Sequence, residues 1–276
     1  MKPFGIRYTL TLSILLLNAF CVSAAENTPA ARWNFDEGSK NNITGYAKYV
    51  TGVRGSALKF DGFTTRVTHK SDASIDMANG FTVEAWVAPQ TYSWNWTGIV
   101  DQEKDHREGF SFGINHIGQV GLSLAVGGKW HTLLSEKPIP LLKWSHAAVT
   151  YDPTGGMAVY VNGQPAGSNT VRGNPTPSRA ELWIGMSHTR QYPQLTERKP
   201  SMGFLSWMAF DGLIDEVQIH DRAQSAEEIK RSFAAVTPPK RRPLSYRKMP
   251  SGPEKINGFG AFYTRLKYAP EWERIW

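Results

Sequence analysis

Short apolar or alternating runs recur between Arg32 and Ile219, and Gly, Asn, Asp and Pro residues separate them. The runs are Arg32–Asp36, Ser56–Phe60, Thr65–His69, Phe81–Ala88, Gly109–Asn115, Gln119–Val126, Ser145–Tyr151, Met157–Asn162, Ala180–Met186 and Leu213–His220. Such runs, roughly 8 to 15 residues apart with turn residues between them, are typical of an all-β sandwich or barrel. The dipeptide Asn162-Gly163 predicts a tight hairpin, because a type I′ turn needs positive φ at both central residues.

One short helix is predicted at the end of this β-rich region. Ser225 and Glu228 have the spacing of a capping box, in which each side chain satisfies a free backbone N–H group. Ile229 and Phe233 follow on one helix face and can pack onto the sandwich. Pro238-Pro239 stops any continuation of the helix.

Residues 1–24 have the three parts of a secretory signal: Lys2 and Arg7, an apolar run over 9–20, and small residues at 22–24. The apolar run is shorter than the roughly 20 residues that span a bilayer. Cys21, the only cysteine, lies inside this segment, so thiol catalysis and cysteine-based metal sites are excluded for the mature chain. We therefore expect a secreted, periplasmic or cell-surface protein without a transmembrane segment after signal cleavage.

The net charge of +7 is concentrated near the chain ends. Residues 25–236 carry 20 Lys and Arg against 21 Asp and Glu, whereas residues 237–276 carry 9 against 3. Because the main region is not basic, we expect no nucleic-acid partner. Residues 237–276 are interpreted as a basic linker and the truncated start of a following domain, since aromatic residues are frequent after 256. The alternative is a tail that packs back on the sandwich.

Six blocks of the sequence resemble the laminin-G-like jelly-roll domains of the concanavalin A-like lectin/glucanase superfamily. The blocks are Trp33–Gly38, Gly55–Gly62, Gly80–Val87, Trp144–Asp152, Val159–Gly163 and Asp211–Val217. The resemblance implies one domain over 25–236, with two antiparallel sheets packed face to face and one short C-terminal helix. It also implies that Trp33–Asp36 lies beside Ile214–Val217. Lectins, glycanases, adhesion modules and passive spacers share this fold.

The resemblance further implies a structural Ca²⁺ ion where the chain ends meet. Separately, we expect the protein to be a monomer. The candidate ligands are Asp36, Asn42 and Asp215, with Asp61 as a weaker fourth. Ca²⁺ takes six to eight oxygen ligands. The alternative is that Asp36 and Asp215 cap strands and turns through hydrogen bonds.

Aromatic residues outside the predicted strands are the candidates for contact with a glycan. Tyr92, Trp94 and Trp96 would share one face if their loop were extended. His131, beside Trp130, belongs to a predicted rim loop, and the predicted irregular segment 188–202 contains the last two candidates, Arg190 and Tyr192. The alternatives are an aromatic cluster folded onto the sandwich edge and a solvated loop.

Catalysis is not expected within the residues present. Glycanases of the superfamily use a Glu-x-Asp-x-(x)-Glu pattern, which does not occur here. Asp101, Glu103 and Asp105 alternate, but they lie beside Lys104 and Arg107 in what is predicted to be an exposed loop.

Three functions remain in competition. The first is an exported noncatalytic carbohydrate-binding or substrate-targeting module, including the front part of a polysaccharide-degrading enzyme. The second is a glycoside hydrolase or polysaccharide lyase on the same scaffold, which a buried carboxylate pair in a groove would favour. The third is an adhesion or structural domain of the cell envelope, which a flat apolar patch would favour.

Overall fold

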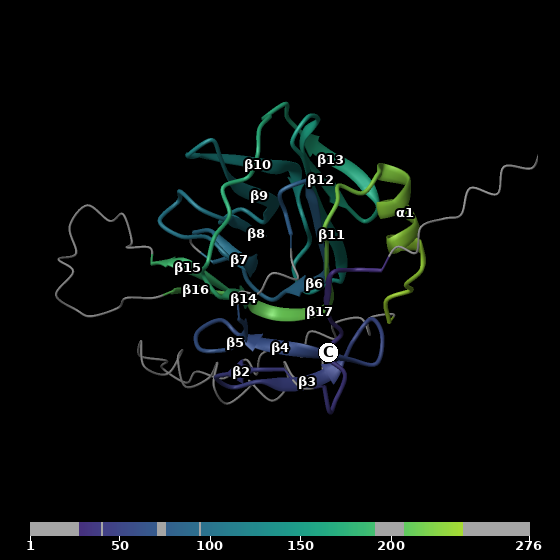
Figure 1. Ribbon diagram of the computed structural model, residues 1–276. Helices are drawn as coiled ribbons and strands as arrows, with labels where there is room; N and C mark the ends of the chain where they lie inside the picture. Colours follow the sequence, from purple (N-terminus) through teal and green to yellow (C-terminus); the bar gives the residue numbers. More distant parts are fainter. Residues whose placement is uncertain (1–27, 40, 71–75, 94, 191–206, 240–276) are drawn as a thin grey trace, which may run out of the picture.

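The computed structural model describes residues 28–39, 41–70, 76–93, 95–190 and 207–239. The predicted signal and the segment after 239 lie outside these ranges. Figure 1 shows a β-sandwich with one short helix, which confirms the predicted jelly-roll architecture. Within the described ranges, no helix has the length and apolar character that a membrane crossing requires.

The larger sheet has eight strands. In spatial order they are β13 (Gln164–Ser168), β12 (Gly156–Val161), β11 (Ser145–Asp152), β6 (Phe81–Pro89), β17 (Asp211–His220), β4 (Ser56–Asp61) and β3 (Lys48–Thr51), with β1 (Ala31–Trp33) also paired to β17. Trp33 lies opposite Val217 in antiparallel register. This pairing of the first and last strands confirms the predicted closure, although β1 ends at Trp33 rather than at Asp36.

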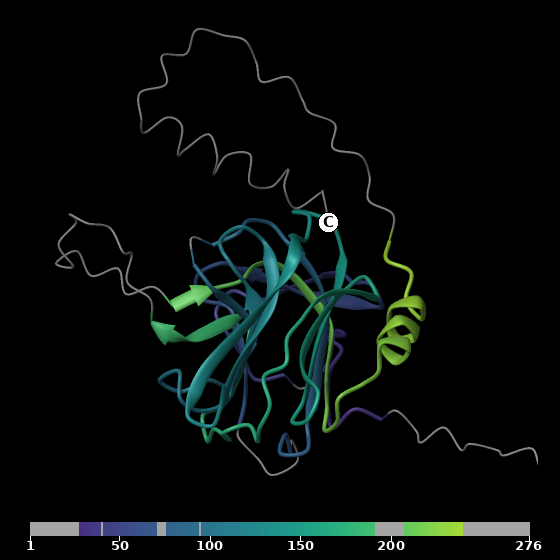
Figure 2. The same cartoon turned by 90° about the horizontal axis from the view of Figure 1, so that it is seen from above.

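The second sheet has seven strands, and it carries the candidate site. In spatial order they are β10 (Lys129–Pro138), β9 (Gln119–Val126), β8 (Phe110–Ile114), β7 (Thr97–Asp101), β14 (Leu182–Ile184), β5 (Arg66–His69) and β2 (Ile43–Thr44). A separate hairpin pairs β15 (Met186–Arg190) with β16 (Trp207–Ala209). Figure 2 shows the two layers of the sandwich from above.

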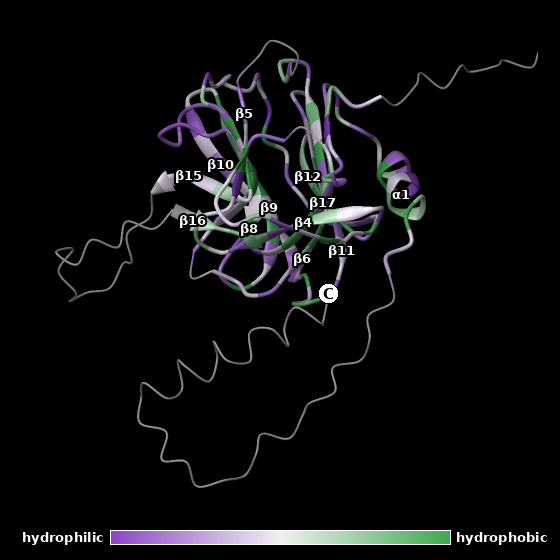
Figure 3. Cartoon of the chain, turned by 90° about the horizontal axis from the view of Figure 1, so that it is seen from below, coloured by the Kyte–Doolittle hydropathy of each residue, from purple (hydrophilic) through white to green (hydrophobic). Residues whose placement is uncertain are grey.

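The hydrophobic core fills the space between the two sheets. In β6, Val83, Ala85 and Val87 face this core, while Glu84 and Trp86 project from the outer face. Strands that alternate in this way bury one side and leave the other for a second contact. Figure 3 shows hydrophobic strand segments gathered toward the interior and hydrophilic residues along the rim loops.

The helix α1 (Ala226–Ala234) covers part of the outer face of the larger sheet. Ser225 and Glu228 form the predicted capping box. Ile229 is fully buried, and Phe233 stacks on Trp86 with ring centroids 5.7 Å apart. The predicted packing of the helix is thus confirmed.

Several predicted elements differ from the structure. The residues predicted as a rim loop around His131 instead form β10, a ten-residue edge strand after the turn at Gly127-Gly128. The run 180–186 is two strands, because Gly185 adopts positive φ between β14 and β15. Residues 188–190 belong to β15 rather than to an irregular segment.

Candidate functional site

A row of polar side chains crosses four neighbouring strands of the seven-stranded sheet. Asp101 of β7 pairs with Ser111 of β8, Ser111 with Ser123 of β9, and Ser123 with Thr132 of β10. Directly paired residues project from the same face of a sheet. Since the alternate residues on these strands face the core, this polar row lies on the outer face of the sandwich.

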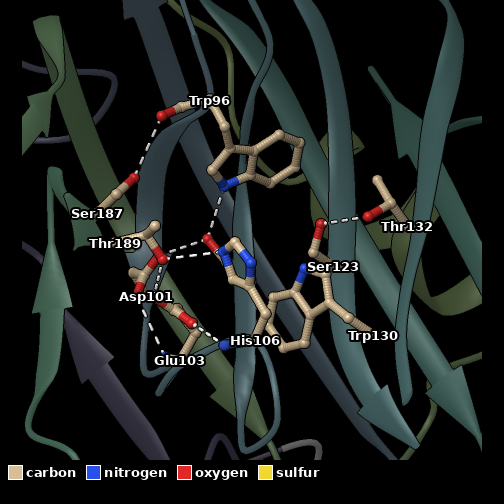
Figure 4. A pocket seen from close by; sticks show the side chains of 10 residues that line it. Trp96, Asp101, Glu103, His106, Ser123, Trp130, Thr132, Ser187 and Thr189 are labelled. Atoms are coloured by element: carbon tan, nitrogen blue, oxygen red, sulfur yellow. Dashed lines mark hydrogen bonds between the residues drawn. The ribbon is translucent and has the colours of Figure 1, made fainter. Parts of the chain in front are cut away.

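The polar row lines a hollow of about 170 Å³. Its lining residues are Trp96, Asp101, Glu103, His106, Ser111, Ser123, Trp130, Thr132, Ser187 and Thr189. A second hollow, of about 570 Å³, adjoins it and shares Glu103, His106 and Thr189 with it. We call the two together the trough. Figure 4 shows Trp96 near the stacked rings of His106 and Trp130, with Ser187 and Thr189 on one side of the rings and Ser123 and Thr132 on the other.

The indole of Trp96 is held against the sheet by the polar row. Its Nε1–H donates to the Ser111 hydroxyl over 2.7 Å, and that hydroxyl donates to Asp101 over 2.5 Å. A Cβ atom at Gly113 would lie 2.9 Å from the Trp96 ring, so glycine at this position lets the indole lie close to the strand. The orientation of Trp96 is therefore fixed from two sides.

The indole of Trp130 is held by a second set of contacts. His106 stacks on it with ring centroids 5.3 Å apart. Thr189 donates its single hydroxyl proton to Glu103, so its 3.0 Å contact with His106 Nε2 is one in which the imidazole donates. Each tryptophan is thus linked to a buried carboxylate through a hydroxyl group.

A strained turn places His106 on Trp130. Asp105 and His106 both have positive φ, at 54° and 53°, in a tight turn between Lys104 and Glu108. Residues other than glycine adopt this left-handed conformation at a cost in free energy. Such strained residues cluster at active sites and ligand-binding sites. Glu103 Oε2 supports the turn by accepting the backbone N–H of His106 over 3.0 Å.

Asp101 is the most deeply buried ionisable group of the trough, with 1% of its surface exposed. Burial raises the pKa of Asp101 to about 7, and the negative charge of Glu103 adds to this effect. The Ser111 hydroxyl and the backbone N–H groups of Glu103 and His188 donate to Asp101 and counteract the rise. A carboxyl group in this state exchanges its proton near neutral pH.

The sequence matches the model of a known protein family. The sequence profile of a family described as the concanavalin A-like lectin/glucanases superfamily matches residues 61–230. The chain belongs to this superfamily. Among curated proteins, none is similar enough in sequence to match the chain.

Solved structures of the superfamily's fold include carbohydrate-binding and receptor-binding domains. Domain 4 of AbnA, an extracellular arabinanase of Geobacillus stearothermophilus solved with arabinotriose, shares 21% identity at a TM-score of 0.55, over 74% of this chain and 97% of that one. The binding domain of botulinum neurotoxin serotype G shares 15% identity at a TM-score of 0.58, over 75% and 51%. Botulinum neurotoxin type C, whose cell entry depends on interaction with two ganglioside molecules, shares 17% identity at a TM-score of 0.54, over 71% and 46%. At these identities the likeness shows the fold.

The aromatic residues predicted from the loop before β7 lie at separate places in this superfamily member. Trp96 lines the trough. Tyr92 instead packs against the core edge, and its hydroxyl donates to the Ile139 carbonyl. Trp94 lies outside the described residues. The alternative of an aromatic folded onto the sandwich edge thus describes Tyr92.

The remaining predicted ligand residues are placed only in part. His131 pairs with Leu124, a core residue, so it projects from the face of β10 opposite to Trp130 and Thr132. The backbone of Arg190 ends β15, and its side chain is not among those described. Tyr192 lies outside the described residues.

The predicted calcium ligands make hydrogen bonds with the backbone. Asp36 accepts the N–H of Ser56 over 3.0 Å, and Asp215 accepts that of Val53 over 2.8 Å. Asn42 is exposed, and its backbone carbonyl accepts the backbone N–H of Thr68 in β5. No group of three or more His, Cys, Asp or Glu side chains could share a metal ion in the part of the chain described. Calcium binding stays a prediction, and the contacts favour the capping alternative.

The carboxylates of the trough were not predicted as site residues. Asp101 and Glu103 were expected in an exposed loop, but they are 1% and 3% exposed. That expectation is wrong because Asp101 ends β7, and Thr189 of β15 contacts Glu103. The alternation of Asp101, Glu103 and Asp105 was the available signal. Its flanking Lys104 and Arg107 are exposed, as expected.

Proposed function

We propose that this chain is an exported, noncatalytic carbohydrate-binding or substrate-targeting module and that the trough holds its glycan. The observation that carries the proposal is a pair of indoles, Trp96 and Trp130, fixed in orientation around a row of hydroxyl groups. Aromatic faces pack against apolar surfaces, and a few convergent polar groups orient a ligand. A sugar ring presents an apolar C–H face and several hydroxyl groups, so it matches both parts of the trough.

The setting of the module is part of the proposal. The signal-like residues 1–24 support export to the periplasm, the cell surface or the medium. The aromatic segment after residue 256 supports a role as the front part of a polysaccharide-degrading enzyme. The solved relatives that bind arabinotriose or interact with gangliosides support a glycan as the partner.

The proposal is tested by retention of the full chain in native gels that contain soluble polysaccharides. Wild-type protein should be retarded by at least one of arabinan, xylan, β-glucan, pectate and alginate. Trp96→Ala and Trp130→Ala should each weaken that binding at least tenfold, or about 1.4 kcal/mol. The matched control is Tyr46→Ala, because Tyr46 is 84% exposed on the turn between β2 and β3 and does not line the trough.

The outcomes of this assay separate the candidate functions. Retention that Trp96→Ala and Trp130→Ala leave unchanged, or that Tyr46→Ala abolishes, moves the glycan site elsewhere. Failure to bind any polysaccharide would favour the adhesion or structural function. Repeating the assay with EDTA tests whether glycan binding needs calcium. We expect unchanged retention, because the carboxylates of Asp36 and Asp215 already accept hydrogen bonds from backbone N–H groups.

A glycoside hydrolase is the second candidate, because two buried carboxylates lie in the trough. The pKa of Asp101, about 7, suits a general acid near neutral pH. The hydrogen bonds weigh against this function. Both oxygens of Asp101 and both oxygens of Glu103 already accept from protein donors.

The hydrolase candidate is tested by the release of reducing ends from any polysaccharide that the protein retains. We expect no release above a protein-free control over a day of incubation. Turnover by the wild type that both Asp101→Asn and Glu103→Gln abolish, while the variants still bind, would make the second candidate the correct one.

A further inference from the structure

The charges around the trough restrict the kind of glycan that it accepts. Asp101 and Glu103 line the first hollow, and none of its described lining residues is a lysine or an arginine. Because burial raises the pKa of Asp101 to about 7, Asp101 is only partly ionised at neutral pH, and the charge of this hollow comes mainly from Glu103. In the adjoining hollow, Glu103 and Asp105 outnumber the single cation, Lys104. The described lining is therefore acidic on balance.

The histidines do not reverse this balance. Burial lowers the pKa of His188, which favours its uncharged form at neutral pH. His106 directs its Nε2–H at the Thr189 hydroxyl and one ring face at Trp130, so this nitrogen and this face already have partners within the protein. Glu103, only 3% exposed, stands between the two hollows.

An anionic sugar would meet these carboxylates at short range. A uronate or sulfate group in the trough would add a further negative charge near Glu103 and Asp105. Screening by water is weakest at Glu103, because that carboxylate is buried. An uncharged sugar avoids this cost. Its hydroxyl groups can donate to the exposed carboxylate of Asp105 and can exchange hydrogen bonds with Ser123 and Thr132, which now bond to each other over 2.8 Å.

We propose that the trough selects uncharged glycans and disfavours uronic-acid and sulfated ones. The geometry behind this proposal is the position of Glu103, which lines both the hollow that contains Trp96 and Trp130 and the adjoining hollow that contains Asp105. This selectivity rests on the proposed function, since it describes the ligand of the same site. The charge of the trough determines which class of glycan binds, whereas the two tryptophans can contact the ring of any sugar.

The test compares polysaccharides that share a backbone and differ in charge. The full chain is run in native gels that contain hydroxyethyl cellulose or carboxymethyl cellulose, and highly methyl-esterified pectin or the same pectin after saponification. Arabinan and alginate are added as an unrelated neutral and acidic probe. We expect the neutral probes that bind to do so at least tenfold more tightly than their acidic counterparts at low salt.

Charge-removing variants locate the effect. The double variant Glu103→Gln with Asp105→Asn should narrow the neutral-to-acidic ratio severalfold, and asparagine tolerates the positive φ at position 105. Glu37→Gln removes one charge from an exposed position outside the trough and should leave the ratio unchanged.

The results distinguish this inference from the function on which it rests. Equal or tighter binding of the acidic probes would overturn the charge selectivity while glycan binding itself stands. A ratio that the double variant leaves unchanged would also overturn it, because the selectivity would then arise elsewhere. If no probe binds, the proposed function fails and the selectivity fails with it.

Discussion

At the scale of single residues, the trough is built from two short chains of contacts. Asp101 fixes Ser111, which fixes the indole of Trp96. Glu103 fixes Thr189, which holds His106 on Trp130. Rings that are already oriented lose little freedom when a ligand binds, so affinity rises through pre-organisation. On this account the buried carboxylates act as positioning residues.

Ser111→Ala tests the first of these chains. The change removes the acceptor of the Trp96 indole N–H and the hydroxyl donor to Asp101. Glycan affinity should fall severalfold, and the free energy of unfolding should fall by about 1–3 kcal/mol, because a buried carboxyl group loses a donor. Isothermal titration with a retained polysaccharide and urea unfolding give the two values.

Ser123→Ala is the matched control, since Ser123 belongs to the same polar row but bonds to Thr132 rather than to the Trp96 indole. The NMR signal of the Trp96 indole N–H should shift in Ser111→Ala and keep its position in Ser123→Ala. If Ser111→Ala kept both the wild-type affinity and the wild-type Trp96 signal, the positioning role of Asp101 would be refuted.

The sequence indicated Trp96 as a ligand residue, because it lies in an aromatic loop between two predicted strands. Trp130 was noted only as the neighbour of His131. The choice between the two depends on which face of β10 each occupies, and only the pairing of His131 with Leu124 settles that register. Residues brought together by cross-strand pairing leave no periodic signal in a single segment.

At the scale of elements, α1 is held over the larger sheet by a buried polar cluster. Glu84 of β6 accepts from Ser232 of the helix over 2.8 Å and contacts His146 Nε2 at 3.1 Å, with His220 Nε2 at 3.7 Å. Burial opposes ionisation of Glu84, but its interactions with both histidines and Ser232 outweigh burial and lower its pKa to about 2. The helix is therefore docked onto an ionised carboxylate.

Acid should weaken this docking. Because the pKa of Glu84 lies below its ordinary value of 4.5, the group stabilises the fold above pH 4.5, and that contribution is lost as the pH falls from about 4.5 toward 2. The difference in unfolding free energy between wild type and Glu84→Gln should shrink over this interval, as measured by urea unfolding at each pH. A difference that stays constant from pH 6 to pH 2.5 would contradict the assignment.

The helix was predictable and the edge strand β10 was not, for a physical reason. Ser225, Glu228 and Ile229 lie within one local segment, so capping and amphipathic spacing are visible in the sequence. In β10, exposed and half-buried residues outnumber the single buried one, Ser135, because the strand has one neighbour and covers little of the core. The segment is a strand because its backbone pairs with β9, and this pairing is not visible in its own sequence.

At the scale of the whole molecule, the sandwich closes where β1 and β4 lie end to end along one edge of β17. β6 occupies the other edge of β17, so residues near both ends of the domain meet in one sheet. The family resemblance predicted this closure, since Trp33–Gly38 and Asp211–Val217 are among its blocks. It did not predict the trough, because the superfamily's shared residues build the sheets and the trough is built largely from loops and outward-facing positions.

The most direct measurement of the account follows the indole N–H signals of the full chain by NMR while a polysaccharide fragment that it binds is added. Phenylalanine substitution of individual tryptophans assigns the signals. The trough predicts that the signals of Trp96 and Trp130 move together to saturation, whereas the signal of Trp86, covered by Phe233, stays in place. Saturation without movement at Trp96 and Trp130 would contradict the proposed site.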